Sequence, residues 1–264
     1  MPLLDLASTP TLRDLPALAT LAVVGAVASG LNAVAGGGSL LSFPTLVAFG
    51  VPPLQANATN ALALWPGSIS GALGFLNKLE KTKRALYVMV LPSVIGAAAG
   101  AALLTVTPER AFKLVVPVLV LAATILLAFQ PRIRRWSRSE HARLPLGWSV
   151  ALQLAISIYG GYFGAGMGIL MLAVLGLFIE GTIHELNAVK TWLGLLINLV
   201  ASVFFLGKGL IVLWPGLALM AGAIAGGYFS ARLSQRVDAE KLRKGIVVLG
   251  LAMAAWFTLD VLRS

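Results

Sequence analysis

The sequence has no cysteine and few charged residues. Without cysteine, the 264-residue chain forms no disulfide and binds no metal ion or iron–sulfur cluster through thiolates. Its two histidines are too few for most metal or haem sites. Charged residues make up 11% of the chain, whereas an ordinary soluble domain has about 25%. Because so few charges cannot cover a water-facing surface, we expect an integral membrane protein.

The sequence also lacks the motifs of enzymes and of ATP-driven pumps. It contains no P-loop, no H-E-x-x-H zinc motif, no nucleophile elbow and no paired carboxylates. It has no ring of acidic residues such as cation channels use. We therefore expect no enzyme activity, no metal ion and no cofactor.

The formal net charge of +10 comes from basic residues that gather in short loops between apolar runs. This distribution is typical of the cytoplasmic loops of membrane proteins, so nucleic acid is not an expected partner. The first six residues carry no basic residue ahead of the apolar stretch, unlike a signal peptide.

Long apolar runs dominate the chain, with 58% hydrophobic residues and a mean hydropathy of +0.90. Unbroken runs favour spanning helices over a barrel, whose strands alternate in polarity. A spanning helix needs about 20 apolar residues. Two of the runs, 39–50 and 169–180, are too short and predict half-helices or re-entrant segments. The runs are 17–35, 39–50, 55–77, 85–106, 111–129, 146–167, 169–180, 184–206, 211–233 and 243–262.

The same five elements occur twice. A shift of 130 residues places Gly36 on Gly166, Gly38 on Gly168 and Asn57 on Asn187. This match indicates an internal duplication. We predict an N-terminal segment over 1–16, a first membrane repeat over 17–129, a basic cytoplasmic linker over 130–145 and a second membrane repeat over 146–262.

The basic residues predict how the two halves are oriented. If the halves are inverted and both termini lie outside, 14 Lys and Arg residues lie inside and 5 outside. Parallel halves would give 12 and 7. The positive-inside rule therefore favours inverted repeats. The predicted fold is an all-α integral membrane protein with two inverted repeats of about five helical elements each, including short broken or re-entrant half-helices.

A glycine cluster precedes each short run and is the first candidate site. Glycine clusters are poor helix formers, and an opened backbone in a membrane is tolerated where it lines a wet cavity. The free N–H groups of the half-helix that follows would attract an anion. The alternative is close helix packing through small residues. The candidate substrate-binding residues here are Asn32, Gly36, Gly37, Gly38, Ser39, Gly166 and Gly168.

A second candidate site holds amides and one lysine. Asn57 and Asn60 lie one helical turn apart, and Asn187 and Lys190 repeat this spacing. Lys190 is the only basic residue well inside a predicted span, and no acidic residue lies in the middle of any span. Such a lysine suggests a bound anion. The alternative is that its ammonium snorkels to the membrane interface.

Three further polar residues allow weaker predictions. Histidine titrates near neutral pH, so His184 is a candidate proton relay; a solvated loop histidine is the alternative. We expect Asn198 and its repeat counterpart Ser68 either to contact substrate or to form hydrogen bonds between helices.

The ordered motifs of both halves together resemble the TauE/SafE family, also called TSUP, over nearly the whole chain. The residues that carry the resemblance are Asn32–Ser39, Phe43-Pro44, Gly50–Pro53, Ala56–Asn60, Gly160–Ile169 and Leu186–Lys190. The resemblance implies a bacterial inner-membrane permease for sulfur-containing anions such as sulfite or a sulfonate.

These lines of reasoning predict a secondary transporter that exports or imports a small oxyanion by alternating access. Two alternatives are a passive anion channel and a membrane scaffold without cargo. The expected partners are a small anionic substrate and the lipid bilayer, and a homo-oligomer is compatible with the sequence.

Overall fold

The chain folds into a bundle of helices. The computed structural model describes residues 11, 13–34, 36–74, 79–136, 145–179, 181–233 and 239–263, and it contains no strand among them. An all-α architecture is thereby confirmed. The helices are α1 (Leu15–Val34), α2 (Ser39–Ala48), α3 (Pro53–Gly74), α4 (Lys83–Val106), α5 (Glu109–Trp136), α6 (Leu146–Tyr162), α7 (Met167–Phe178), α8 (Ile183–Gly207), α9 (Leu213–Leu233) and α10 (Ala239–Arg263).

The helices fall into long and short classes, as the apolar runs predict. Five of the described helices, α1, α4, α5, α8 and α10, contain stretches that are long and apolar enough to cross a membrane. The helices α2 and α7 have 10 and 12 residues. At 1.5 Å per residue they span about 15–18 Å, roughly half of a bilayer core. The two half-helices are thereby confirmed.

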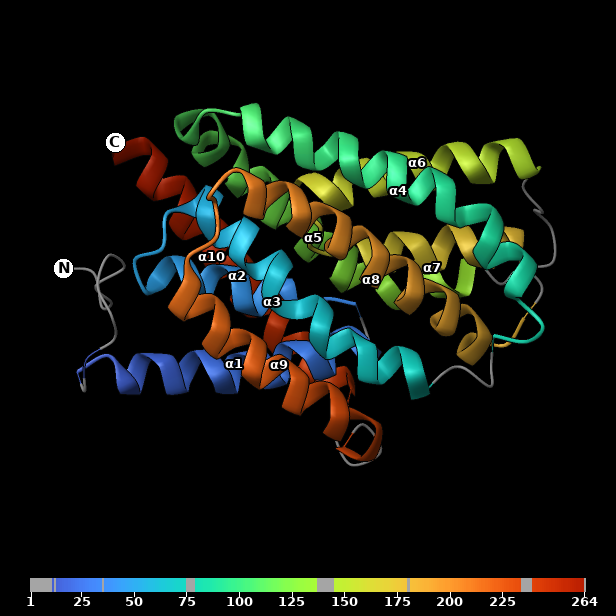
Figure 1. Cartoon of the computed structure of the whole chain (residues 1–264), viewed down its shortest axis with the longest axis horizontal. Helices are drawn as coiled ribbons and strands as arrows, with labels where there is room; N and C mark the ends of the chain where they lie inside the picture. The colour runs from blue at the N-terminus through green and yellow to red at the C-terminus, as the bar shows by residue number, and fades with distance from the viewer. Residues whose placement is uncertain are drawn as a thin grey trace.

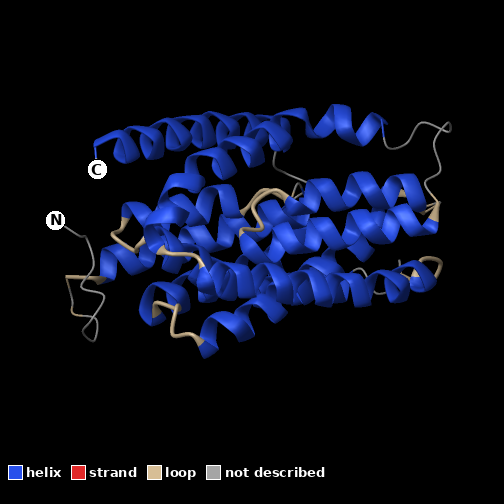
Figure 2. Cartoon of the chain, turned by 90° about the horizontal axis from the view of Figure 1, so that it is seen from above, coloured by secondary structure: helices blue, strands red, loops and turns tan. Residues whose placement is uncertain are grey.

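Contacts between helices recur when the two halves are exchanged. Helix α1 packs on α9 just as α6 packs on α4, and α3 packs on α9 just as α8 packs on α4. The counterparts α3 and α8 also pack on each other, as do α5 and α10. Figures 1 and 2 show the resulting interleaved bundle. This pattern agrees with the duplication expected from the sequence.

The α1–α9 and α4–α6 contacts are close because glycines lie in them. A Cβ atom on Gly222 or Gly226 of α9 would overlap a backbone carbonyl of α1. On α4, a Cβ on Gly96 would lie 2.6 Å from the carbonyl oxygen of Leu154 in α6. Small residues therefore let these backbones approach, as is common between membrane helices.

The two half-helices lie in opposite halves of the bundle. In Figure 1, α2 lies towards the end where α1 begins, and α7 lies towards the other end. Helix α10 also ends near the end where α1 begins. The inversion of the repeats across a membrane stays a prediction.

Two helix boundaries differ most from the expected runs. Helix α5 continues through Pro131 to Trp136, so the start of the predicted linker 130–145 is helical. The guanidinium of Arg132 lies over the ring of Phe129, 5.3 Å from its centroid, within this end of the helix. Helix α6 ends at Tyr162 instead of residue 167, because the backbone breaks before α7. Residues 137–144 of the linker, and nearly all of the N-terminal segment before 13, lie outside the described residues.

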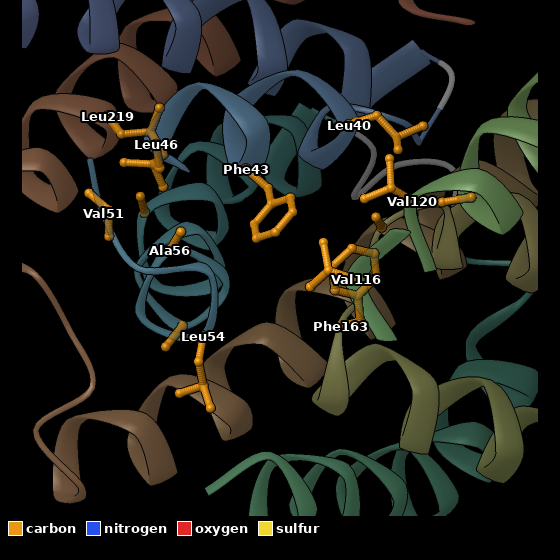
Figure 3. Close-up of a cluster of buried hydrophobic side chains, with 14 of the residues drawn as sticks. Leu40, Phe43, Leu46, Val51, Leu54, Ala56, Val116, Val120, Phe163 and Leu219 are labelled. Carbon is orange, nitrogen blue, oxygen red and sulfur yellow. The ribbon is translucent and has the colours of Figure 1, made fainter. Parts of the chain in front are cut away.

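A buried apolar cluster holds α2 against the second half (Figure 3). The ring of Phe43 in α2 packs edge-on against Phe163, which follows α6, with centroids 5.4 Å apart. Phe43 also stacks on Phe257 of α10 at 5.8 Å. Because these rings come from both halves, the cluster fixes the two broken segments next to each other.

Candidate functional site

The two broken segments meet inside the bundle. A Cβ atom on Gly36 would lie 3.3 Å from the Cα of Gly168, so the two backbones are nearly in contact. Gly36 has φ +78° and Gly166, its counterpart in the second half, has φ +76°. Side chains strongly disfavour this left-handed conformation. Glycine is thus needed at both positions to form two equivalent turns. The glycine clusters therefore break the helices, and they also allow the two backbones to pack closely.

The first break is closed by the last turn of α1. The N–H of Gly36 donates to the carbonyl of Leu31 at 3.0 Å. The N–H of Gly38 donates to the side-chain Oδ1 of Asn32 at 2.8 Å. Helix α2 then begins at Ser39. Asn32 therefore satisfies one of the free N–H groups at the start of this half-helix.

The second break is closed by side chains from α3 and α6. The amide Nδ2 of Asn57 donates to the carbonyl of Tyr162 at 2.8 Å. The hydroxyl of Tyr159 donates to the carbonyl of Ala165. Gly166 then caps the start of α7. Carbonyl groups freed by the end of α6 are thus partly satisfied inside the protein, as a membrane interior requires.

A cavity of about 70 Å³ lies where the breaks meet. Its volume would hold about five water molecules, since one water needs about 10–15 Å³. Six predicted residues line it: Asn32, Gly36, Ser39, Asn60, Gly168 and Lys190. Further polar side chains in its wall are Ser29, Ser68, Thr191 and Asn198, and its apolar lining includes Phe163, Met167, Met171 and Leu195.

Lys190 bridges the two breaks. Its side chain is only 4% exposed. Its Nζ donates to the backbone carbonyl of Asn32 at 3.1 Å. A Cβ on Gly168 would lie 3.5 Å from the Cδ of Lys190, so the aliphatic stem packs on the second break. The ammonium therefore lies at the centre of the bundle and does not snorkel to an interface.

The charge of the cavity has one sign. Lys190 is the only Lys, Arg, Asp or Glu among the described residues that line it. The positive end of α2 opens onto the same space through Ser39. Asn60 adds a buried amide whose Oδ1 accepts a hydrogen bond from the hydroxyl of Ser42 in α2. The cavity thus has cationic character and suits an anion.

Five of the predicted residues do not line the cavity: Gly37, Gly38, Asn57, Gly166 and Asn187. Asn57 is instead bonded to the backbone of the second break, at the carbonyl of Tyr162. Gly38 lies against the carbonyl of Ala28, Gly37 against Leu127 and Gly166 against Ala123. Asn187 is 9% exposed, and its Oδ1 has no hydrogen-bond partner among the described residues. Gly37, Gly38 and Gly166 therefore pack the two breaks against neighbouring parts of the bundle.

His184 lies apart from this site. It is exposed in the first turn of α8 and does not line the cavity. The neighbouring Thr182 and Glu185 form a capping box at the start of the helix. His184 therefore has the setting of a solvated histidine, and we do not include it in the proposed site.

Ser29 and Thr191 line the cavity but are not predicted from the sequence. Ser29 lies three residues before Asn32 and so shares its helix face. Thr191 is adjacent to Lys190, and its hydroxyl donates to the carbonyl of Asn187 at 2.7 Å. Helical spacing from Asn32 would have found Ser29, whereas Asn198 and Ser68, which also line the cavity, are already candidates from the sequence. No three His, Asp or Glu side chains of the described residues come close enough to hold a metal ion.

Comparisons with known proteins identify the family to which the chain belongs. The family model described as "Sulfite exporter TauE/SafE" matches residues 21–257. A probable membrane transporter protein of Haemophilus influenzae is 29% identical, covering 92% of this chain and 95% of the relative. The probable membrane transporter protein YfcA of Escherichia coli K12 is 26% identical, with 92% and 90% covered.

A third relative, the probable membrane transporter protein ORF9 of a Sinorhizobium species, is 28% identical over 90% of both chains. No solved structure matches the chain. The family match covers both repeats and both broken segments. The chain therefore belongs to the TauE/SafE family of membrane transporters.

Proposed function

We propose that this protein is a secondary transporter of a small sulfur-containing oxyanion, such as sulfite or an organosulfonate. It works by alternating access in the bacterial inner membrane and catalyses no chemical reaction. The observation that supports the proposal most is the cavity between the broken segments, which contains Lys190 and the start of α2.

The cavity can replace the hydration that an anion loses when it leaves water. An isolated charge in a low-dielectric interior is very costly unless it is paired and hydrogen-bonded. Lys190 supplies the opposite charge, and the start of α2 adds the positive end of a helix dipole through Ser39. The amide of Asn60 and the hydroxyl of Ser39 add polar contacts. A volume of about 70 Å³ fits a small anion better than a large one.

The duplicated contacts support alternating access as the transport mechanism. Because α1–α9 and α4–α6 are equivalent close pairs, each made of one helix from either half, one pair can rock against the other while the breaks stay at the centre. Proton coupling would supply the energy. Alternatively, the membrane potential, negative inside, would drive a negative charge outwards.

Flux into proteoliposomes tests this function. The purified chain is reconstituted, and labelled sulfite, thiosulfate, sulfoacetate and sulfate are offered in turn. A transporter gives saturable uptake that is accelerated when unlabelled substrate is trapped inside. A passive channel gives non-saturating flux and single-channel currents in planar bilayers. The proposal would be contradicted, and a scaffold favoured, if none of the four anions gave flux and none stabilised the protein against thermal unfolding.

A further inference from the structure

Asn32 contacts both of the groups that are proposed to hold the anion. Its side-chain Oδ1 accepts from the N–H of Gly38 at 2.8 Å, at the positive end of α2. Its backbone carbonyl accepts from the Nζ of Lys190 at 3.1 Å. Asn32 also lines the cavity. One residue therefore brings neutral oxygen atoms to a half-helix N-terminus and to the buried ammonium.

The position of the side chain is tightly determined. A Cβ on Gly38 would lie 2.9 Å from the Cγ of Asn32, so the amide packs directly on the backbone that it caps. At the equivalent place in the second half, the chain has Tyr162, whose carbonyl accepts from Asn57 at 2.8 Å. The phenol ring of a tyrosine has no amide oxygen to offer. Among the described residues, only the first break therefore has an amide acceptor from its own preceding helix.

An amide oxygen and an oxygen of a sulfite or sulfonate group accept the same hydrogen bonds. They differ in charge, since the amide is neutral and the anion is not. Hydrogen bonds to a charged acceptor are roughly twice as strong as those to a neutral one. Gly38 does not itself line the cavity, but Asn32, whose amide oxygen accepts from its N–H, does. An anion that reaches the cavity and moves this amide aside can therefore replace the amide oxygen at the N–H of Gly38.

We propose that Asn32 is an internal ligand: its amide oxygen occupies the anion position at the start of α2 in the empty protein, and the substrate displaces it. This inference rests on the proposed function and assigns the anion to the first break rather than the second. The amide keeps a buried donor satisfied while the site is empty. It thereby sets the affinity for the anion.

Two substitutions with opposite effects test the inference. Asn32→Ala removes the competing oxygen, so sulfite should bind about two- to tenfold more tightly, the range given by one hydrogen bond of ordinary net strength. Asn32→Asp places a fixed carboxylate at the same donor, so sulfite should bind roughly tenfold more weakly or worse. Dissociation constants are measured on the full chain in detergent by titration with sodium sulfite, with sodium chloride at equal ionic strength as the blank.

The outcomes separate the possible roles of Asn32. Unchanged affinity in both variants would show that Asn32 is only structural, and weaker binding by Asn32→Ala would make it a direct ligand; either result overturns the inference. If Asn32→Ala does not fold, Asn32→Ser replaces it, because serine is too short to reach Gly38. Gln153→Ala removes another buried amide, bonded to Ser93 at 2.9 Å outside the cavity, and should leave the affinity unchanged. Failure of the wild-type chain to bind sulfite, thiosulfate or sulfoacetate would instead contradict the proposed function itself.

Discussion

At the scale of single residues, the site depends on backbone groups as much as on side chains. Gly36 and Gly168 let two backbones come within van der Waals contact, and Lys190 donates to a backbone carbonyl. Asn57 likewise uses its amide on a carbonyl, that of Tyr162. The polar side chains near the breaks therefore satisfy an opened backbone, and Asn32 and Lys190 do so while they also line the cavity.

This backbone role explains which site residues could be predicted. Lys190 is recognisable because it is the one basic residue within a span, and the glycines because they repeat at a fixed offset. The acceptor of Lys190 is a carbonyl 158 residues earlier, and a carbonyl leaves no trace in residue type. For the same reason Asn57 is predicted to bind substrate, although the structure has it bonded to the backbone of the second break.

The left-handed turn at Gly36 gives a prediction. Gly36→Ala should lower the melting temperature and reduce transport, because an L-residue at φ +78° costs about 1–2 kcal/mol. The new Cβ also presses on Gly168 at 3.3 Å. The matched control is Gly147→Ala in α6, where a Cβ meets nothing within 4 Å. Equal melting curves for Gly36→Ala and the wild type would contradict the assigned turn.

At the scale of elements, short helices and close pairs position the site. The lengths of α2 and α7 follow from the glycine clusters that precede them and from short apolar runs, so their existence is readable from the sequence. The end of α6 is less readable, because residues 163–167 are as apolar as the helix before them. Pro131 does not end α5, since a proline can be accommodated where neighbouring groups satisfy the backbone.

The close contact between α1 and α9 can be tested by adding volume. Gly222→Val places methyl groups where the carbonyl of Ala22 lies, so the two helices must separate. Overpacking of this kind costs about 1–3 kcal/mol. We expect a lower midpoint of thermal unfolding in detergent. Ala225→Val, on an exposed face of the same helix, should leave the midpoint unchanged; a similar loss in both variants would argue against the close contact.

At the scale of the whole molecule, the chain combines two equivalent halves around one asymmetric site. The duplication is predictable from the 130-residue offset, and the recurring helix contacts agree with it. The exchange of partners between halves, with α1 on α9 and α4 on α6, could not be predicted. The pairing depends on which glycine-containing helix faces pack together, and the glycine pattern of a single helix does not tell which partner it has.

Single cysteines test the predicted inversion against a background without native cysteine. Lys81→Cys and Lys208→Cys lie at exposed positions next to α4 and α8. With inverted repeats and both termini outside, a membrane-impermeant maleimide should label position 208 in intact spheroplasts and position 81 only after lysis. Labelling of both positions from the same side would contradict the inversion.

Transport by Lys190→Met tests the central claim most directly: that an anion crosses the membrane by way of the cavity between the two breaks. Lys113→Met is the control, because it removes the same charge from a partly exposed ion pair with Asp260, outside the cavity. Both variants are checked for wild-type expression and elution before uptake of the best of the four sulfur anions is measured in proteoliposomes. We predict that Lys190→Met falls to the level of protein-free liposomes while Lys113→Met keeps most of the flux. Uptake by Lys190→Met at the wild-type rate would contradict the account.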